Sequence, residues 1–568
     1  MKSRNRNRRD FLRDAGAALS AMALAPRLLA ETAEIKSVIF STEGEATRDR
    51  SAKMRGIMVD VARVPERLEF YKRVIEFCAD WELNTLHFRL ADDQGTALRF
   101  ASAPDLVAHE NAFKPEELHD LAGYAQSHGV DLLPELESFG HTGYITCAPA
   151  YAHLLDKDSN GSDEFTGMIP LDPETLDLFA KLYREIASIF PSPYLHGGCD
   201  EVNWGGSALS QKALQTKSRA QIWAEYLNAL NKISQKLGKQ FIVWGDVVLH
   251  KEPGVLGKLD KNIVIMDWNY SENSSASLHA SLETIRANGS RAIGAPGLIS
   301  YKWGPRPGSE QLRNIDAFAD AYLSSNNEAS LGVILTNWVP SRYIQNSIWD
   351  GFAYAAVAFK DGTRAAQTTA FRRFVERHYR AQWNEDWAEA FQIIYDSAPA
   401  VKETAETWII PELLVPWSSD GELAAALTRQ LPRSNPFTRL RSVLVKVEPQ
   451  VMKNLGDFQA FQLCAEYLER TFWRESIVAE QAALPHDRET CDLLIKSIAE
   501  RDDLLVKALR KDWDEGRFVN SAARLRPVVD LAPKDQLLFQ WERATVYSAA
   551  LAVHPERFFQ ILTAAKSA

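Results

Sequence analysis

Two adjacent carboxylates, Asp200 and Glu201, are the residues of this chain with the clearest chemical potential. They close the stretch 193–201, in which a short apolar segment passes through small residues into the acids. Small residues let a backbone come close to a ligand, and neighbouring acids repel each other unless another group binds one of them. Cleavage of a glycosidic bond uses such a pair, one acid to protonate the leaving oxygen and one to stabilise positive charge on the sugar. The alternative is an acidic helix start, because Asp and Glu favour the first turn of a helix.

Eight short β-rich runs, each followed by a helix-like stretch, lie between residue 55 and about residue 340. They are Gly56–Ala62, Thr85–Leu90, Asp131–Glu135, Tyr194–Gly197, Phe241–Trp244, Ile263–Trp268, Ala292–Ala295 and Gly332–Trp338. Because parallel strands need crossover helices, this alternation predicts an α/β fold, a closed (β/α)8 TIM barrel. An open doubly wound sheet is the structural alternative.

Polar and aromatic residues gather at the same end of nearly every predicted strand. In chain order they are Asp60, Arg63, Asp92, Asp93, Glu135, Glu137, His141, Asp200, Glu201, Trp244, Asp246, Trp268 and Trp338. In a barrel the carboxyl ends of all strands meet at one rim, which is where active sites lie. This distribution therefore predicts a functional site at that rim.

The first thirty residues have the pattern of an export signal. A basic head that contains Arg8-Arg9 precedes a mildly apolar run, residues 15–25, which is too short to span a bilayer. This arrangement is typical of a twin-arginine signal peptide and predicts export to the periplasm. A disordered basic tail is the alternative. We expect no membrane-spanning segment after removal of residues 1–30.

The pattern changes beyond residue 361, where long amphipathic segments replace the β-rich runs. We therefore predict a lead-in over 31–53, a catalytic barrel over 54–361 and an α-helical C-terminal domain over 362–568. The helical domain contains no recognisable chemical motif.

Composition excludes several classes of function. The chain has 568 residues, 46% of them hydrophobic, and a formal charge of -10, which argues against a nucleic-acid partner. Its five cysteines have neither a disulfide framework nor zinc-site spacing, and a bridge between Cys464 and Cys491 stays open. Neither His141 nor His196 has partners at metal-ligand spacing, so no metal or cofactor is expected.

Four segments in order resemble the β-N-acetylhexosaminidases of glycoside hydrolase family 20. They are Arg55–Arg63, Leu83–Gly95, Leu133–Thr142 and His196–Glu201. The last is similar to the signature His-x-Gly-Gly-Asp-Glu, with Cys199 in place of the second glycine. The resemblance covers about residues 54–350.

This resemblance implies an exo-acting, retaining enzyme that releases terminal GlcNAc or GalNAc from glycans. The 2-acetamido group of the sugar would act as the nucleophile. Glu201 would be the general acid and Asp200 would hold the acetamido N–H. In this assignment Glu201 is protonated near neutral pH, and an ionised Asp200 beside it raises its pKa.

The resemblance also implies four polar substrate-binding residues. Arg63 would bind ring hydroxyls, and Asp92, rather than Asp93, would be the acidic partner of the site. His141 would orient a proton while Glu137 holds its other ring nitrogen. A surface salt bridge, a turn cap and a buried core histidine are the structural alternatives for Arg63, Asp92 and His141.

Aromatic residues complete the implied site. Trp244, Trp268 and Trp338 would enclose the N-acetyl methyl, and Tyr301 would hydrogen-bond the acetamido oxygen. A role in core packing is the alternative for each tryptophan.

The chain also departs from the family pattern. Arg89 replaces a histidine, and Val339-Pro340 follows Trp338 where an acid is common. Two other functions therefore remain open: a carbohydrate-binding protein without turnover, and a glycosidase for sugars that lack the acetamido group.

Overall fold

The computed structural model describes most of the chain beyond residue 52. The described residues are 53–158, 166–170, 172–252, 254–299, 305–323, 328–397, 402–403, 408–409, 416–427, 435–483, 487–518 and 537–565. The predicted signal and nearly all of the predicted lead-in lie outside these ranges, as does Tyr301.

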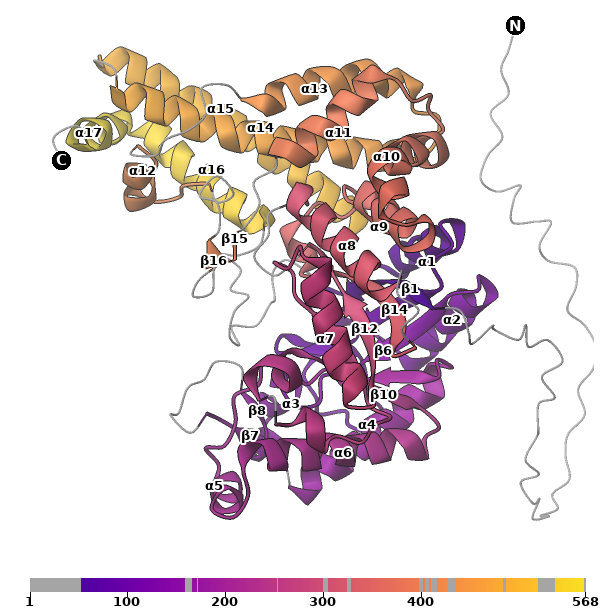
Figure 1. Ribbon diagram of the computed structural model, residues 1–568. Coiled ribbons are helices and arrows are strands. Elements are labelled where there is room, and N and C mark those ends of the chain that lie inside the picture. Colours follow the sequence, from indigo (N-terminus) through magenta and orange to yellow (C-terminus); the bar gives the residue numbers. More distant parts are fainter. Residues whose placement is uncertain are drawn as a thin grey trace, which may run out of the picture. The chain divides into compact units, whose positions relative to one another are not determined.

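Eight parallel strands form a closed barrel (Figure 1). They are β1 (Met54–Asp60), β2 (Thr85–Arg89), β6 (Asp131–Glu135), β9 (Tyr194–His196), β10 (Gln240–Trp244), β11 (Val264–Trp268), β12 (Arg291–Ala295) and β14 (Ser330–Asn337). Each pairs in parallel with the next, and β14 returns to β1, which closes the sheet. The predicted TIM barrel is thus confirmed, and the open sheet is wrong.

The barrel strands are buried along most of their length, as expected for parallel strands covered by helices. The covering helices are α1 (Leu68–Asp80), α2 (Pro115–Ser127), α4 (Pro173–Ile189), α6 (Arg219–Lys236), α7 (Ser275–Ala287), α8 (Ser309–Tyr322) and α9 (Trp349–Asp361). Among the described residues between β10 and β11, no α-helix is found where one was expected. A π-helical turn, Val247–Lys251, and a 3-10 turn, Leu256–Lys258, stand there, because Pro253, Gly254 and Gly257 weaken a helix in the middle of the linking segment.

Short strands and helices lie in the segments that connect the barrel strands to the covering helices. They are β3 (Ala91–Asp92), β4 (Gly95–Leu98), β5 (Ala108–Phe113), α3 (Gly143–Thr146), β7 (Leu155–Asp156), β8 (Gly167–Met168), α5 (Ala208–Leu214) and β13 (Gly297–Ile299). Most follow the carboxyl ends of β2, β6 and β9, and so they surround the rim that carries the predicted site.

The C-terminal region is helical, as predicted, and is drawn in orange to yellow in Figure 1. Its elements are α10 (Thr363–Phe374), α11 (Glu385–Ser397), β15 (Lys402–Glu403), β16 (Trp408–Ile409), α12 (Asp420–Ala426), α13 (Pro436–Val447), α14 (Leu455–Ala483), α15 (Arg488–Gly516), α16 (Leu537–Val553) and α17 (Pro555–Ala565). None of the helices in the described ranges combines the length and the apolar content needed to cross a bilayer.

The two cysteines considered for a bridge do not form one. Cys464 and Cys491 are separate thiols, and they are buried in different hydrophobic clusters.

Candidate active site

Asp200 and Glu201 lie in the turn after β9, at the carboxyl end of the barrel strands. Its backbone is left-handed at Gly198 (φ 64°), Cys199 (φ 74°) and Glu201 (φ 47°). A Cβ on Gly198 would lie 1.9 Å from Glu137 Oε2, so the space that this glycine leaves is filled by a buried carboxylate rather than by a ligand. Cys199 holds a left-handed conformation that costs a non-glycine residue about 1–3 kcal/mol.

His141 joins the two acids. Its Nε2 lies 3.4 Å from Glu201 Oε2 and 3.8 Å from Asp200 Oδ2, while its Nδ1 lies 3.2 Å from Asp93 Oδ2. Burial would lower the pKa of His141, but nearby anions, Asp200 among them, raise it well above its ordinary value. A charged imidazolium therefore sits between the paired acids and Asp93.

The role expected for Glu137 is wrong. Glu137 is buried and accepts hydrogen bonds from Arg89 Nη2 (2.7 Å) and from the backbone N–H of Cys199 (3.0 Å), while Asp93 contacts the Nδ1 of His141. Burial raises the pKa of Glu137 well above its usual range. Glu137 therefore holds the backbone of the turn that carries Asp200 and Glu201, and it does not orient His141. Spacing along the chain did not identify Asp93 as the partner of His141, because the loops that carry these residues follow different strands.

The pKa shifts of Asp200 and Glu201 differ from the expected assignment. Burial raises the pKa of Asp200, against the opposing charges of His141 and Arg89. Burial also favours the neutral form of Glu201, but the hydrogen bond and charge of His141, together with Lys251, outweigh it and lower the pKa of Glu201. In the ligand-free protein the pKa values of the two acids therefore shift in directions opposite to those expected, because the imidazolium lies closer to Glu201 than to Asp200.

Two buried arginines organise the acids that follow β1 and β2. Arg63 lies 2.8 Å from Asp60 Oδ2 and 3.0 Å from Asp92 Oδ2, and Arg89 also pairs with Asp92. Burial would raise the pKa of Asp92, but both arginines hold it well below its usual range. The two guanidinium carbons lie 5.4 Å (Arg63) and 5.0 Å (Arg89) from the ring centre of Trp338. Asp92 is thus an ionised partner of Arg63 and not a turn cap alone.

Three predicted tryptophans lie at or just below this rim. Trp244 is buried in the barrel interior, 5.7 Å from Trp338, and Trp268 is partly exposed. Sequence reasoning missed Tyr270, whose hydroxyl accepts the Nε1–H of Trp338 (2.7 Å) and whose ring stacks on Trp268 at 5.1 Å. One indication of this role was present in the sequence, because Tyr270 lies two residues after Trp268 at the carboxyl end of a predicted strand. Tyr301, the predicted tyrosine, lies outside the described residues.

Asp246 supports Glu201 from the next strand. Its Oδ2 accepts the backbone N–H of Glu201 at 3.2 Å and lies 3.3 Å from Lys251 Nζ. Burial and the charges of Asp200 and Glu201 raise the pKa of Asp246 to about 6. This carboxylate therefore changes charge close to neutral pH.

Spacing along the chain underestimated how many potential metal ligands meet in the fold. Three sets of side chains in the described ranges have ligand atoms within 4.8 Å of one another: His87, Glu135 and His196; Asp92, Asp93 and His141; His141, Asp200 and Glu201. Arg63, Arg89 and the charged His141 already neutralise carboxylates in these sets, so the geometry fits an ion-pair network.

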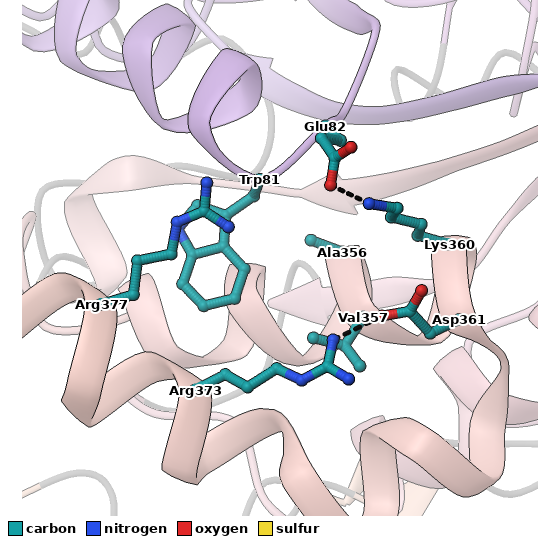
Figure 2. Close-up of a pocket in the computed structure, with 8 residues that line it drawn as sticks. All are labelled: Trp81, Glu82, Ala356, Val357, Lys360, Asp361, Arg373 and Arg377. Carbon is teal, nitrogen blue, oxygen red and sulfur yellow. Dashed lines mark hydrogen bonds and ion pairs between the residues drawn. The ribbon is translucent and has the colours of Figure 1, made fainter.

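A cavity of about 210 Å³ lies elsewhere, near the amino ends of the strands (Figure 2). Glu82 pairs there with Lys360 and Asp361 pairs with Arg373, while Arg377 lies 5.1 Å from the ring centre of Trp81. Its charged groups bind one another, and it takes no part in the rim site.

The comparisons with known proteins agree with this placement. The profile described as "Glycosyl hydrolase family 20, catalytic domain" matches residues 53–301, which contain both acids and His141. A β-hexosaminidase of Vibrio furnissii is 27% identical over 250 residues, which is 38% of this chain and 40% of that protein. The β-hexosaminidase subunit β of Mus musculus is 25% identical over 264 residues, which is 44% of this chain and 46% of that protein.

The matched region spans less than half the length of these curated relatives. Among solved structures, a GH20 exo-β-N-acetylglucosaminidase from Vibrio harveyi in complex with N-acetylglucosamine is 22% identical. It has a TM-score of 0.43 and covers 56% of this chain and 54% of that chain.

Proposed function

Because this chain belongs to glycosyl hydrolase family 20, we propose that it is an exo-acting β-N-acetylhexosaminidase that releases terminal GlcNAc or GalNAc from glycans. The observation that carries the proposal is the contact of Asp200 and Glu201 with one imidazolium at the rim of the matched barrel. A pair of acids in different environments suits two different tasks in glycoside cleavage.

The proposed reaction retains the configuration of the sugar. The acetamido oxygen forms a bond to the anomeric carbon as the glycosidic bond breaks, and Glu201 donates its proton to the leaving oxygen. Water then attacks the oxazolinium ion and gives its proton to Glu201, which restores the enzyme. Asp200 accepts a hydrogen bond from the acetamido N–H throughout, because positive charge develops on that group.

A buried carboxylate oxygen without a hydrogen bond from the described residues supports this role of Asp200. Its Oδ1 is buried and accepts no hydrogen bond from the residues that the structure describes, although an unsatisfied buried carboxylate oxygen is costly. An acetamido N–H would satisfy this oxygen and favour the anion.

Substrate binding would also raise the pKa of Glu201, which a proton donor requires. The side chain of Glu201 is 36% exposed, so a sugar that covers it removes water and raises its pKa. Binding therefore moves both acids toward the order that catalysis requires.

A screen of the purified protein against aryl β-glycosides tests the proposal. We expect hydrolysis of the N-acetylglucosaminide or N-acetylgalactosaminide, with the β-anomer as first product, and none of the glucoside or galactoside. Hydrolysis of the latter two alone would favour a site without the acetamido contact. Sugar binding without any hydrolysis would favour a binding protein.

Replacing Asp246 with asparagine is expected to move the alkaline limb of the pH profile of kcat/KM to lower pH. Asparagine keeps an acceptor for the Glu201 N–H but removes a negative charge, and an anionic neighbour raises the pKa of an acid. Because the pKa of Asp246 is about 6, this charge exists mainly above pH 6, so the acid limb should change little.

The opposite substitution provides the control for this prediction. Lys251 is more than half exposed and its charge lowers the pKa of Glu201, so Lys251→Met should move the alkaline limb to higher pH. Shifts in the same direction for both variants would contradict the proposed electrostatic coupling.

Replacing Tyr270 with phenylalanine is expected to raise KM for the aryl N-acetylglucosaminide by about tenfold, because the buried Trp338 Nε1–H loses its acceptor. Tyr322→Phe is the matched control, since Tyr322 is also buried but donates to Asp267 instead. We expect it to lower Tm without changing KM. An unchanged KM for Tyr270→Phe would show that Trp338 needs no such anchor.

A further inference from the structure

The C-terminal end of α15 packs against the loops that follow β1 and β14. Arg517 directly follows the helix and is only 2% exposed, and its guanidinium carbon lies 4.4 Å from the ring centre of Trp513. Its Nε donates to both carboxylate oxygens of Glu66, at 2.8 and 3.1 Å, and its Nη2 donates to the carbonyl of Pro340 at 2.7 Å. One side chain of the helical region therefore bridges two barrel loops.

Additional contacts hold the helix end in this position. Arg67 donates to the carbonyls of Asp514 and Glu515, both at 3.1 Å, where a cation suits the negative end of the helix dipole. A Cβ on Gly516 would lie 2.7 Å from Gln345 Oε1, so only glycine packs here without displacing that side chain.

The two bridged loops carry residues of the rim site. Glu66 lies three residues after Arg63, and Pro340 lies two residues after Trp338. Asp60 joins the loops, because its Oδ2 accepts the N–H of Val339 at 3.1 Å and pairs with Arg63. Displacement of either loop would thus move Arg63 or Trp338.

Glu66 is poorly suited to its position without Arg517. It is 2% exposed, and burial raises its pKa while the charge and hydrogen bond of Arg517 lower it. Removing one partner of a buried ion pair leaves an uncompensated charge, which a loop relieves by moving toward water.

We propose that Arg517 is a positioning residue through which the helical C-terminal region holds Arg63 and Trp338 in place for the sugar. The kinetic consequences of this inference rest on the proposed function. The effect of Arg517 on the mobility of the two loops does not. It gives the helical region a specific task at the rim.

Arg517→Lys tests the inference because lysine keeps the charge but cannot bridge Glu66 and the backbone carbonyls of Pro340 and Tyr343 as a planar fork does. We expect faster amide hydrogen exchange in residues 61–67 and 338–345. We also expect KM for the aryl N-acetylglucosaminide to rise about tenfold or more, since small displacements of binding groups are costly. The pH profile should change little, because His141, which lowers the pKa of Glu201 most, keeps its position.

Arg474→Lys is the matched control. Arg474 is also buried and paired with a buried acid, Asp502 (3.1 Å). Its contacts with Asp502 and with the carbonyl of Trp417 both lie within the helical region. It should lower Tm without changing KM or exchange in the two loops. If Arg517→Lys does not fold, Glu66→Gln removes the same ion pair with a smaller change of shape. The same rise in KM and in loop exchange is then expected.

Two outcomes would overturn the inference. One is wild-type KM and loop exchange in Arg517→Lys together with a lower Tm, since Arg517 would then be only structural. The other is an equal effect of Arg474→Lys on KM. If the wild-type protein hydrolyses no aryl N-acetylhexosaminide, the proposed function fails, while loop exchange still decides whether Arg517 orders the loops.

Discussion

Replacing Glu201 with glutamine is expected to lower kcat by about 10²–10⁴-fold on substrates with poor leaving groups, the range that general acid catalysis contributes. Glutamine has nearly the same shape but carries no proton that it can donate. The comparison to make is kcat for a series of aryl N-acetylglucosaminides of decreasing leaving-group pKa. The loss should shrink along this series, because a good leaving group departs without protonation.

Binding separates this effect from misfolding. A thiazoline analogue of the proposed intermediate should bind the Glu201→Gln variant, because the contacts to the ring and the acetamido group remain. A loss of kcat that is equal for every leaving group would argue against Glu201 as the proton donor.

Replacing Asp200 with asparagine is expected to lower kcat by about 10²–10³-fold, as removal of one preorganised electrostatic contact does in other enzymes. Asparagine places no negative charge beside the acetamido nitrogen. In contrast to the Glu201 variant, the loss should be similar for all leaving groups, and affinity for the thiazoline should fall.

Asp267→Asn is the matched control for this variant. Asp267 is also a buried acid of the barrel. It accepts hydrogen bonds from Ser281 of α7 and Tyr322 of α8, both at 2.7 Å. We expect a lower Tm and an unchanged kcat. Normal turnover in Asp200→Asn would falsify the proposed substrate-assisted step.

Features that depend on neighbours along the chain could be predicted from the sequence. The eight barrel strands are short β-rich runs between helical patterns, so their composition and length identified each of them. The helical C-terminal region follows from the same periodicity. The one missing helix, between β10 and β11, lies where Pro253 and two glycines weaken a helical segment.

The placement of Asp200 and Glu201 at the rim could also be predicted, because every parallel strand of a barrel ends at the same face. The partners of these acids could not. Asp93 contacts His141 although 48 residues separate them, and Asp246 supports Glu201 across 45 residues. Such pairs depend on strand register and loop conformation, which no local pattern contains.

Protonation and anchoring were decided by the tertiary structure alone. Adjacency of two acids implied that Asp200 raises the pKa of Glu201, yet the imidazolium of His141 lies close enough to lower it. Arg517 reaches Glu66 across 451 residues. The sequence determined which segments form strands and helices and where they end, because those depend on local periodicity. Charge states and supporting contacts depend on distances of a few ångströms between remote segments, which exist only after folding.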